Sequence, residues 1–429
     1  MKKQFCSLII VVFVFSHCIT YAQYCSDVNR FSEIPVFTNE QLTSLSGITY
    51  GSALNAAGQL QDLKLNIFYP SFDYDTSAKR PMIVLMHGGS FLTGSLDSLN
   101  SMCIEFAKRG FVAATIEYRL GWTVTDNCQS VTANTVISVD KAIYRAMQDA
   151  NASIRFLVAN ADIYKADTAW IFAGGLSAGA FATVDMAFAT EEELYVRWPF
   201  CQALGSLYHS GNSLENTFTI KGLFHNWGSI IDINFITAAD AIPMIGFDGD
   251  LDPVSPIDSG YFMGCSSFGL MWGTRAIYNK IRSYGICSEI NVKTHGGHGV
   301  YNQTTEQNIF RIQKAVCFFK SLFCKNCTSE YCTDSVPVSC STTITGMANH
   351  SIPGDKILVY PVPSTGVFTV YSNAKPGSPL KIYNMMGQPV YSGTLETSLN
   401  NTYALSLDLN NGTYILDVAR QRSKLIILR

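Results

Sequence analysis

A serine flanked by glycines is the residue of this chain with the clearest capacity for chemistry. The sequence GLSAG at residues 175–179 follows an apolar run at 169–173 and precedes a run of small helix-forming residues. A strand, a sharp turn and a helix form the setting in which a G-x-S-x-G pattern exposes a serine hydroxyl. Glycines two residues on either side let the strand and the helix approach closely. The pattern therefore predicts that Ser177 is a nucleophile.

A serine hydroxyl needs a base to take its proton and a carboxylate to orient that base. Candidates for both follow Ser177 along the chain. Asp252 stands in the segment DGDLDPV after an expected strand at 243–247, and His298 stands in HGGHG after an expected strand at 290–294. Side chains just past the carboxyl ends of parallel strands share one edge of the sheet. We therefore expect Ser177, Asp252 and His298 to form a catalytic triad.

Each of these two assignments has an alternative in the same segment. Asp250 is the alternative acid, and Asp252 is preferred because it stands third from the glycine and precedes Pro-Val. His295 is the alternative base. His298 is preferred because glycines on both sides leave its imidazole room to reach the serine turn.

Backbone donors are also needed, because acyl transfer develops a negative charge on the carbonyl oxygen. The sequence HGGSF at residues 87–91 follows an expected strand at 82–86, where such donors are found. Glycines in this loop allow amides to turn inward without a Cβ clash. We expect an oxyanion hole made by the amides of Gly89, Ser90 and Ala178. His87 is expected to pack the loop rather than to react.

Neither a metal nor another cofactor is expected. The aspartates at 248, 250 and 252 resemble a calcium loop, but Pro253 and Ser259 stand where an EF-hand needs glycine and glutamate. The cysteines at 324, 327, 332 and 340 have spacing that zinc could use, but no histidine lies nearby. Disulfides are the preferred interpretation of these four, and four cysteines allow three pairings among themselves.

The elements that must position these residues alternate between strand and helix from about residue 60 to 322. The expected helices cover 97–109, 139–159, 178–189, 270–284 and 306–323. The strands between them are apolar on both faces, which is typical of a parallel sheet that is covered on each side. The pattern predicts an α/β fold with a mostly parallel sheet and helices on both faces.

The remainder of the chain has a different composition and sequence pattern. Residues 324–354 are rich in Cys, Ser, Thr and Pro and indicate a linker. Residues 355–429 contain seven short strands separated by turn signals, which predicts a small all-β sandwich. The expected domains are therefore 23–323 and 355–429, joined by that linker.

The first 22 residues have the features of a secretory signal peptide. Lys2 and Lys3 precede an apolar stretch at 8–15, and small residues precede Gln23. A retained anchor is the alternative, but no later segment is apolar over the roughly 18 residues that a transmembrane anchor needs. Removal of the signal leaves eleven of the 13 cysteines. Most of these are expected to form disulfides in an oxidising compartment, with an odd one left over.

The composition narrows the choice of partners. The chain has 429 residues, of which 47% are hydrophobic and 15% are charged, and its net charge is -3. A large core is therefore available. This charge gives no reason to expect nucleic acid or an anionic membrane surface as a partner.

Four motifs together resemble the carboxylesterase/lipase branch of the α/β-hydrolase family. They are HGGSF at 87–91, EYRL at 117–120, QDA at 148–150 and GLSAG at 175–179, and they occur in the family's order. The resemblance covers about residues 40 to 322. It implies a serine carboxylic-ester hydrolase with Ser177, Asp252 and His298 as its triad. Ser90 stands where hormone-sensitive-lipase-like members carry a third glycine.

The final module is similar to the C-terminal sorting domains of type IX secretion cargo. The resemblance is carried by YPVPSTG at 360–366, LNNGTY at 409–414 and the terminal KLIILR at 424–429. It implies export through the periplasm by the type IX secretion machinery, to the outer cell surface or the exterior. A generic β-sandwich, such as a carbohydrate-binding one, is the alternative.

The expected substrate is a small-molecule or polysaccharide-linked ester, with an acyl, acetyl or feruloyl group as its acid. Trp198, in an expected insertion at 191–219, and Trp227 are candidate walls of the substrate site. Two other functions remain open. A peptidase of the same fold would use the same triad, although no propeller domain is evident. A non-catalytic surface-binding protein is the third candidate, because hydrolase folds can lose their chemistry.

Overall fold

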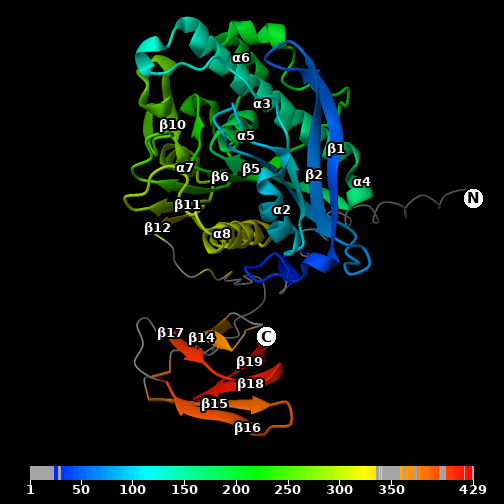
Figure 1. Cartoon of the computed structure of the whole chain (residues 1–429), viewed down its shortest axis with the longest axis vertical. Helices are drawn as coiled ribbons and strands as arrows, with labels where there is room; N and C mark the ends of the chain where they lie inside the picture. Colours follow the sequence, from blue (N-terminus) through cyan, green and yellow to red (C-terminus); the bar gives the residue numbers. More distant parts are fainter. Residues whose placement is uncertain are drawn as a thin grey trace, which may run out of the picture. The chain divides into compact units, whose positions relative to one another are not determined.

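The computed structural model describes residues 24–27, 30–334, 338, 340, 358–360, 364, 366–371, 374–375, 377–395, 402–419 and 421–427. The expected signal peptide, residues 1–22, lies outside them. Contacts divide the chain into two units, at residues 1–345 and 346–429. Figure 1 shows the first unit in blue to yellow and the second in orange to red.

The first unit is built on a nine-stranded sheet whose order is β1-β2-β4-β3-β5-β6-β8-β11-β12. The pairs from β4 to β12 are parallel, whereas β1 and β2 form an antiparallel edge. The strands are β1 (Leu42–Leu54), β2 (Leu60–Pro70), β3 (Arg80–Met86), β4 (Val112–Ile116), β5 (Ala166–Leu176), β6 (Ile220–Asn226), β8 (Met244–Gly249), β11 (Ser288–Lys293) and β12 (Glu330–Thr333).

Helices cover both faces of this sheet, as Figure 1 shows. Strand β3 shows why: Met82 and Val84 belong to one buried apolar cluster, and Ile83 belongs to another. Because side chains alternate across a strand, a strand of this kind needs a helical layer on each side. The first cluster includes residues of α3 (Ala133–Ala159), α5 (Ala178–Phe188) and α7 (Thr274–Ser283), and the second includes residues of α2 (Asn100–Ala107) and α8 (Thr305–Phe323). The predicted α/β class is confirmed.

The structure differs from the sequence-based expectation at three places. The antiparallel strand β1 was not expected. Residues 270–273, expected as the first turn of a helix, form β10 (Leu270–Gly273), which pairs with β7 (Ser229–Ile230) and β9 (Ser259–Tyr261). Strand β12 lies inside the segment expected as a linker and pairs with β11. The pairings of β10 with β7 and of β12 with β11 join residues far apart in sequence, so local patterns do not reveal them, whereas β1 forms a hairpin with the next strand, β2.

Four disulfides are present in the described part of the first unit: Cys25–Cys324, Cys128–Cys265, Cys287–Cys327 and Cys317–Cys340. Cys103, Cys201 and Cys332 are free thiols. The sequence led us to consider pairings within the cluster at 324, 327, 332 and 340. Pairing within the cluster is wrong, whereas the preference for disulfides is confirmed for three of its members, which pair with cysteines elsewhere in the first unit.

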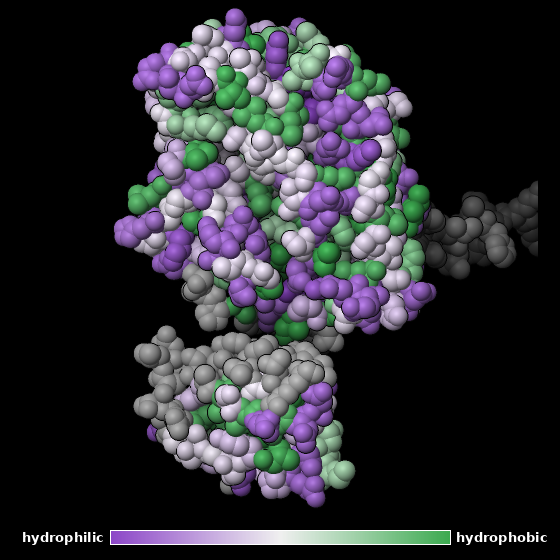
Figure 2. Space-filling view, viewed as in Figure 1, coloured by the Kyte–Doolittle hydropathy of each residue, from purple (hydrophilic) through white to green (hydrophobic). Residues whose placement is uncertain are grey.

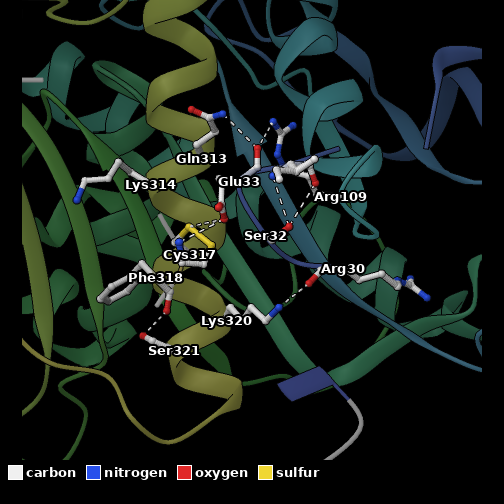
Figure 3. Close-up of a disulfide and its surroundings, with 12 residues drawn as sticks. Arg30, Ser32, Glu33, Arg109, Gln313, Lys314, Cys317, Phe318, Lys320 and Ser321 are labelled. Carbon is white, nitrogen blue, oxygen red and sulfur yellow. Dashed lines mark hydrogen bonds between the residues drawn. A yellow bond between two sulfur atoms is a disulfide. The ribbon is translucent and has the colours of Figure 1, made fainter. Parts of the chain in front are cut away.

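Figure 3 shows how the Cys317 disulfide lies beside the amino-terminal segment. Arg109 and Gln313 both donate hydrogen bonds to the carbonyl of Glu33, over 3.0 and 3.1 Å. Lys320 donates to the carbonyl of Arg30 over 3.0 Å. Gln313 and Lys320 therefore bind the amino-terminal segment to α8, in addition to the disulfide Cys25–Cys324 at the end of that helix.

Hydrophilic side chains are spread over the visible face of the first unit, with hydrophobic ones between them (Figure 2). Among the residues that the structure describes, no helix is both long enough and apolar enough to cross a membrane.

The second unit consists of antiparallel strands in two sheets. One sheet has the order β13-β14-β17 and the other β16-β15-β18-β19. The strands are β13 (Leu358–Tyr360), β14 (Val367–Tyr371), β15 (Pro379–Asn384), β16 (Pro389–Thr394), β17 (Thr402–Ser406), β18 (Gly412–Val418) and β19 (Gln421–Ile427). Apolar residues of both sheets form one buried cluster. The expected small all-β unit is thus present.

Candidate active site

Ser177 stands in a strained turn between β5 and α5. Its φ of 52° lies in the left-handed region, which is uncommon for a residue with a Cβ. The glycines of the motif make the turn possible: a Cβ on Gly179 would lie 2.2 Å from the carbonyl oxygen of Met86, and one on Gly175 would lie 2.5 Å from the backbone of Gly179. The amide of Ser177 donates to the carbonyl of Asn226 over 2.9 Å. The turn is therefore held against both neighbouring strands, β3 and β6.

The structure brings together the three residues expected as a triad. His298 Nε2 lies 2.9 Å from Ser177 Oγ, and His298 Nδ1 lies 2.7 Å from Asp252 Oδ2. The other oxygen of Asp252 accepts the amides of Val254 and Ser255 over 2.8 and 2.9 Å. Asp252 is buried. These contacts fix the carboxylate that holds the imidazole.

The alternative residues do not join this arrangement. His295 is exposed, and Asp250 lies on the turn that precedes Asp252 without contacting His298. The side-chain oxygen Oδ1 of Asp250 is buried and has no hydrogen-bond partner among the described residues.

A second carboxyl lies beneath Asp252. Asp248, on β8, is fully buried and is bonded to Thr274 Oγ1 over 2.6 Å. Burial and the neighbouring charge of Asp252 raise the pKa of Asp248 well above its ordinary value. Thr274 and the amide of Gly249 both donate to the carboxyl of Asp248, so this group is held in place beneath the triad.

The loop expected to supply the oxyanion donors lies beside Ser177. Gly89 and Ser90 have φ values of 116° and 53°, and their amides, like that of Ala178, have no hydrogen-bond acceptor within the described part of the chain. A Cβ on Gly89 would lie 2.1 Å from the carbonyl oxygen of Thr93, so the loop requires glycine there. Free amides next to a nucleophile can stabilise a developing oxyanion.

His87 supports the loop from below. Its ring stacks on Tyr118 with the centroids 4.4 Å apart, and the Tyr118 hydroxyl donates to the His87 carbonyl over 2.9 Å. Burial lowers the pKa of His87, so its imidazole is neutral near pH 7. A Cβ on Gly94 would lie 2.1 Å from His87 Nδ1, which explains the glycine at position 94, three residues after the HGGSF motif.

Ser177 and His298 open into a cavity of about 600 Å³. Trp227 lines this cavity and meets His298 edge to face, with the ring centroids 6.3 Å apart. Polar side chains of Ser98, Ser101, Asn302 and Asn308 also line it. Of the two tryptophans expected at the substrate site, Trp227 lies in the cavity of Ser177.

Trp198 instead lines a separate cavity of about 420 Å³. Its walls are mostly aromatic or aliphatic and come from segments scattered along the sequence: Phe91, Val139, Phe181, Phe200, Phe262 and Phe268. Phe91 follows the loop residue Ser90, and the amide of Phe181 bonds the carbonyl of Ser177 over 2.9 Å. The disulfide Cys128–Cys265 joins two of the loops near this cavity. Among the residues that line this cavity, Trp198 was the one expected from the sequence at the substrate site.

Asp140 is the acidic residue that lines this second cavity. Burial raises its pKa to about 7, against the opposing effect of Arg197. The folded protein therefore binds a proton there more tightly than the unfolded chain does. The contribution of this carboxyl to stability is most favourable at low pH and is lost as the pH rises from about 4 to about 7.

Asp140→Asn is therefore expected to raise the Tm by about 2–4 °C at pH 8, because the amide carries no charge to desolvate. At pH 4 the two proteins should melt within about 1 °C of each other, since Asp140 is then protonated. Thermal melts across pH 4–8 measure the difference. Asp73→Asn, at an exposed position, is the matched control. A Tm difference that does not change with pH would contradict the prediction.

Two regions of the chain match known protein families. Residues 65–239 match the BD-FAE family, and residues 358–428 match the secretion system C-terminal sorting domain. Among curated proteins, the neuroligin-like protein glit-1 of Caenorhabditis elegans is 42% identical over 59 residues, which are 14% of this chain. The match spans 8% of that relative's length.

Several solved structures are also similar. A thermophilic esterase of Thermogutta terrifontis, with propionate bound, is 20% identical with a TM-score of 0.41, over 63% of this chain and 90% of that one. Esterase B of Lactobacillus rhamnosis is 15% identical with a TM-score of 0.42, over 67% of this chain and 88% of that one.

Proposed function

We propose that this chain, whose residues 65–239 match the BD-FAE family and whose residues 358–428 match a secretion sorting domain, is a carboxylic ester hydrolase that cleaves esters through Ser177, His298 and Asp252. The sorting domain directs the chain through type IX secretion to the cell surface or the exterior. The observation that carries the proposed mechanism is the pair of contacts made by His298, 2.9 Å to Ser177 Oγ and 2.7 Å to Asp252 Oδ2.

The first half of the reaction forms an acyl-enzyme. Ser177 Oγ attacks the ester carbonyl while His298 Nε2 takes the hydroxyl proton. Asp252 stabilises the resulting imidazolium, and the amides of Gly89, Ser90 and Ala178 hold the oxyanion. When the tetrahedral intermediate collapses, the carbon–oxygen bond to the alcohol breaks and His298 gives its proton to the leaving alkoxide. Each oxyanion donor is expected to contribute about 3–4 kcal/mol of transition-state stabilisation.

The second half releases the acid. Water attacks the acyl carbonyl while His298 Nε2 takes one of its protons. Collapse of this intermediate breaks the bond to Ser177 Oγ, which recovers its proton from His298. Each turnover therefore consumes one ester and one water and yields one alcohol and one acid.

The two cavities support a proposal about the substrate. The loop at residues 87–91 borders both: its first four residues line the cavity of Ser177, and Phe91 lines the aromatic one. We propose that the acid is an acetyl, longer acyl or feruloyl group, with the aromatic cavity as the site for the larger acids. Rates on p-nitrophenyl acetate, p-nitrophenyl butyrate, methyl ferulate and acetylated xylan would rank these acids.

A fluorophosphonate probe tests the mechanism. We expect the purified chain to gain the mass of one phosphonyl group, mapped to the peptide that contains Ser177, because this hydroxyl has a base within reach. His298→Ala should slow the labelling by at least about 10³-fold. His295→Ala is the matched control and should label at the wild-type rate. An unlabelled Ser177 in a folded, monodisperse protein would overturn the proposed mechanism.

A further inference from the structure

A buried arginine lies between the turn that carries Ser177 and the loop that carries His298. Arg311, on α8, is fully buried. Burial lowers the pKa of its guanidinium to about 9, so that it remains charged at neutral pH. Within the described residues, no carboxylate lies close enough to form a salt bridge with it. A buried cation without a carboxylate partner costs stability, so its neighbours must account for its presence.

On one side the guanidinium contacts the segment that supports the nucleophile turn, residues 175–179. Arg311 Nη1 donates to Asn226 Oδ1 over 2.8 Å. The amide group of Asn226 in turn donates to the carbonyl of Gly175 over 3.0 Å, and its backbone carbonyl accepts the amide of Ser177 over 2.9 Å. Arg311 therefore fixes the residue that holds the turn at Gly175 and at Ser177 itself.

On the other side the same group contacts the base loop, residues 294–304, which carries His298. Arg311 Nε donates to the carbonyl of Tyr301 over 2.9 Å, and Nη2 donates to Asn302 Oδ1 over 2.6 Å. Nη2 also contacts Asn308 Oδ1 on α8. Tyr301 has a φ of 56°, a conformation that needs support from its surroundings.

Trp227 completes the connection. The centre of the guanidinium lies 4.7 Å from the Trp227 ring centroid, and the ring centroid of His298 lies 6.3 Å from the same point. A cation over an indole face is attracted to the ring. Arginine suits this position because its planar group donates in several fixed directions at once, which a lysine ammonium cannot do.

We propose that Arg311 is a positioning residue that joins the nucleophile turn to the base loop and thereby sets the reach between Ser177 Oγ and His298 Nε2. The inference rests on the function proposed above. Its physical reason is that a misplacement of about 1 Å between reacting groups can cost on the order of 100-fold in rate.

The test compares Arg311→Lys with Arg109→Lys. Arg109 is also buried but forms a salt bridge with Glu105 of α2, so the same chemical change is made away from Ser177. With p-nitrophenyl acetate we expect Arg311→Lys to lower kcat by about 30- to 100-fold while KM changes less than about 3-fold. Arg109→Lys should keep kcat within about 2-fold of wild type, although its Tm falls. Equal losses of kcat in the two variants, or a loss that tracks the unfolded fraction, would overturn the proposal.

A second variant covers the case in which Arg311→Lys does not fold. Asn302→Ala removes one acceptor at an exposed position of the base loop and is expected to lower kcat by about 3- to 10-fold. Combined with Arg311→Lys, it should add little further loss, because both changes break the same connection. Fully additive losses, or wild-type kcat in Asn302→Ala, would contradict the proposal. If the wild-type protein neither hydrolysed esters nor reacted with the fluorophosphonate probe, the proposed function itself would be overturned.

Discussion

Replacement of Ser177 by alanine is expected to lower kcat on p-nitrophenyl acetate by about 10⁵- to 10⁶-fold. The change removes the oxygen that would form the acyl-enzyme, and water bound in its place lacks the proton-transfer geometry of a hydroxyl 2.9 Å from His298 Nε2. Oxyanion stabilisation and substrate binding would account for the residual rate. Initial rates at enzyme concentrations in the micromolar range would measure it.

The loss should occur without unfolding. Alanine keeps the Cβ and accepts the same φ of 52° as Ser177, so the Tm should stay within about 2 °C of wild type. Ser283→Ala, on the exposed face of α7, is the matched control and should retain full activity. More than about 1% of the wild-type kcat in Ser177→Ala would show that another group carries out the attack.

The local pattern of the sequence was sufficient to predict the elements that carry the candidate triad. Each expected residue follows an apolar strand, and parallel strands end at the same edge of a sheet. Ser177 follows β5, Asp252 follows β8 and His298 follows β11. The choice of His298 over His295 also rested on a local feature, the flanking glycines. A site built from residues just past strand ends can therefore be predicted from a single sequence.

Features that depend on contacts between distant segments could not be predicted in this way. The aromatic cavity of Trp198 is lined by side chains from at least five separate segments, and no local pattern connects Phe91 with Phe268. The same reason explains the cysteine pairing, in which Cys324 meets Cys25 across 299 residues. Arg311 lies in an amphipathic helix, where an arginine is normally expected to be exposed. Only its contacts with two separate loops reveal why it is buried.

Asp252→Asn is expected to lower kcat by about 10⁴-fold, which corresponds to about 5.5 kcal/mol of transition-state stabilisation. Asp252 Oδ2 accepts the proton on His298 Nδ1 over 2.7 Å, so Nε2 is left unprotonated and faces Ser177. An asparagine amide that donates to Nδ1 would favour the opposite tautomer, with the proton on Nε2. A base in that state cannot accept the serine proton. Steady-state rates on p-nitrophenyl acetate measure the loss.

Asp250→Asn provides the matched control, because it makes the same change two residues away. This variant should keep kcat within about 3-fold of wild type, since Asp250 does not contact His298. Asp248 is not expected to replace Asp252, because its carboxyl is fully buried and bonded to Thr274 and to the amide of Gly249. A large loss in Asp250→Asn with near-normal activity in Asp252→Asn would reverse the assignment of the acid. Equal activity in both variants would mean that His298 acts without an orienting carboxylate.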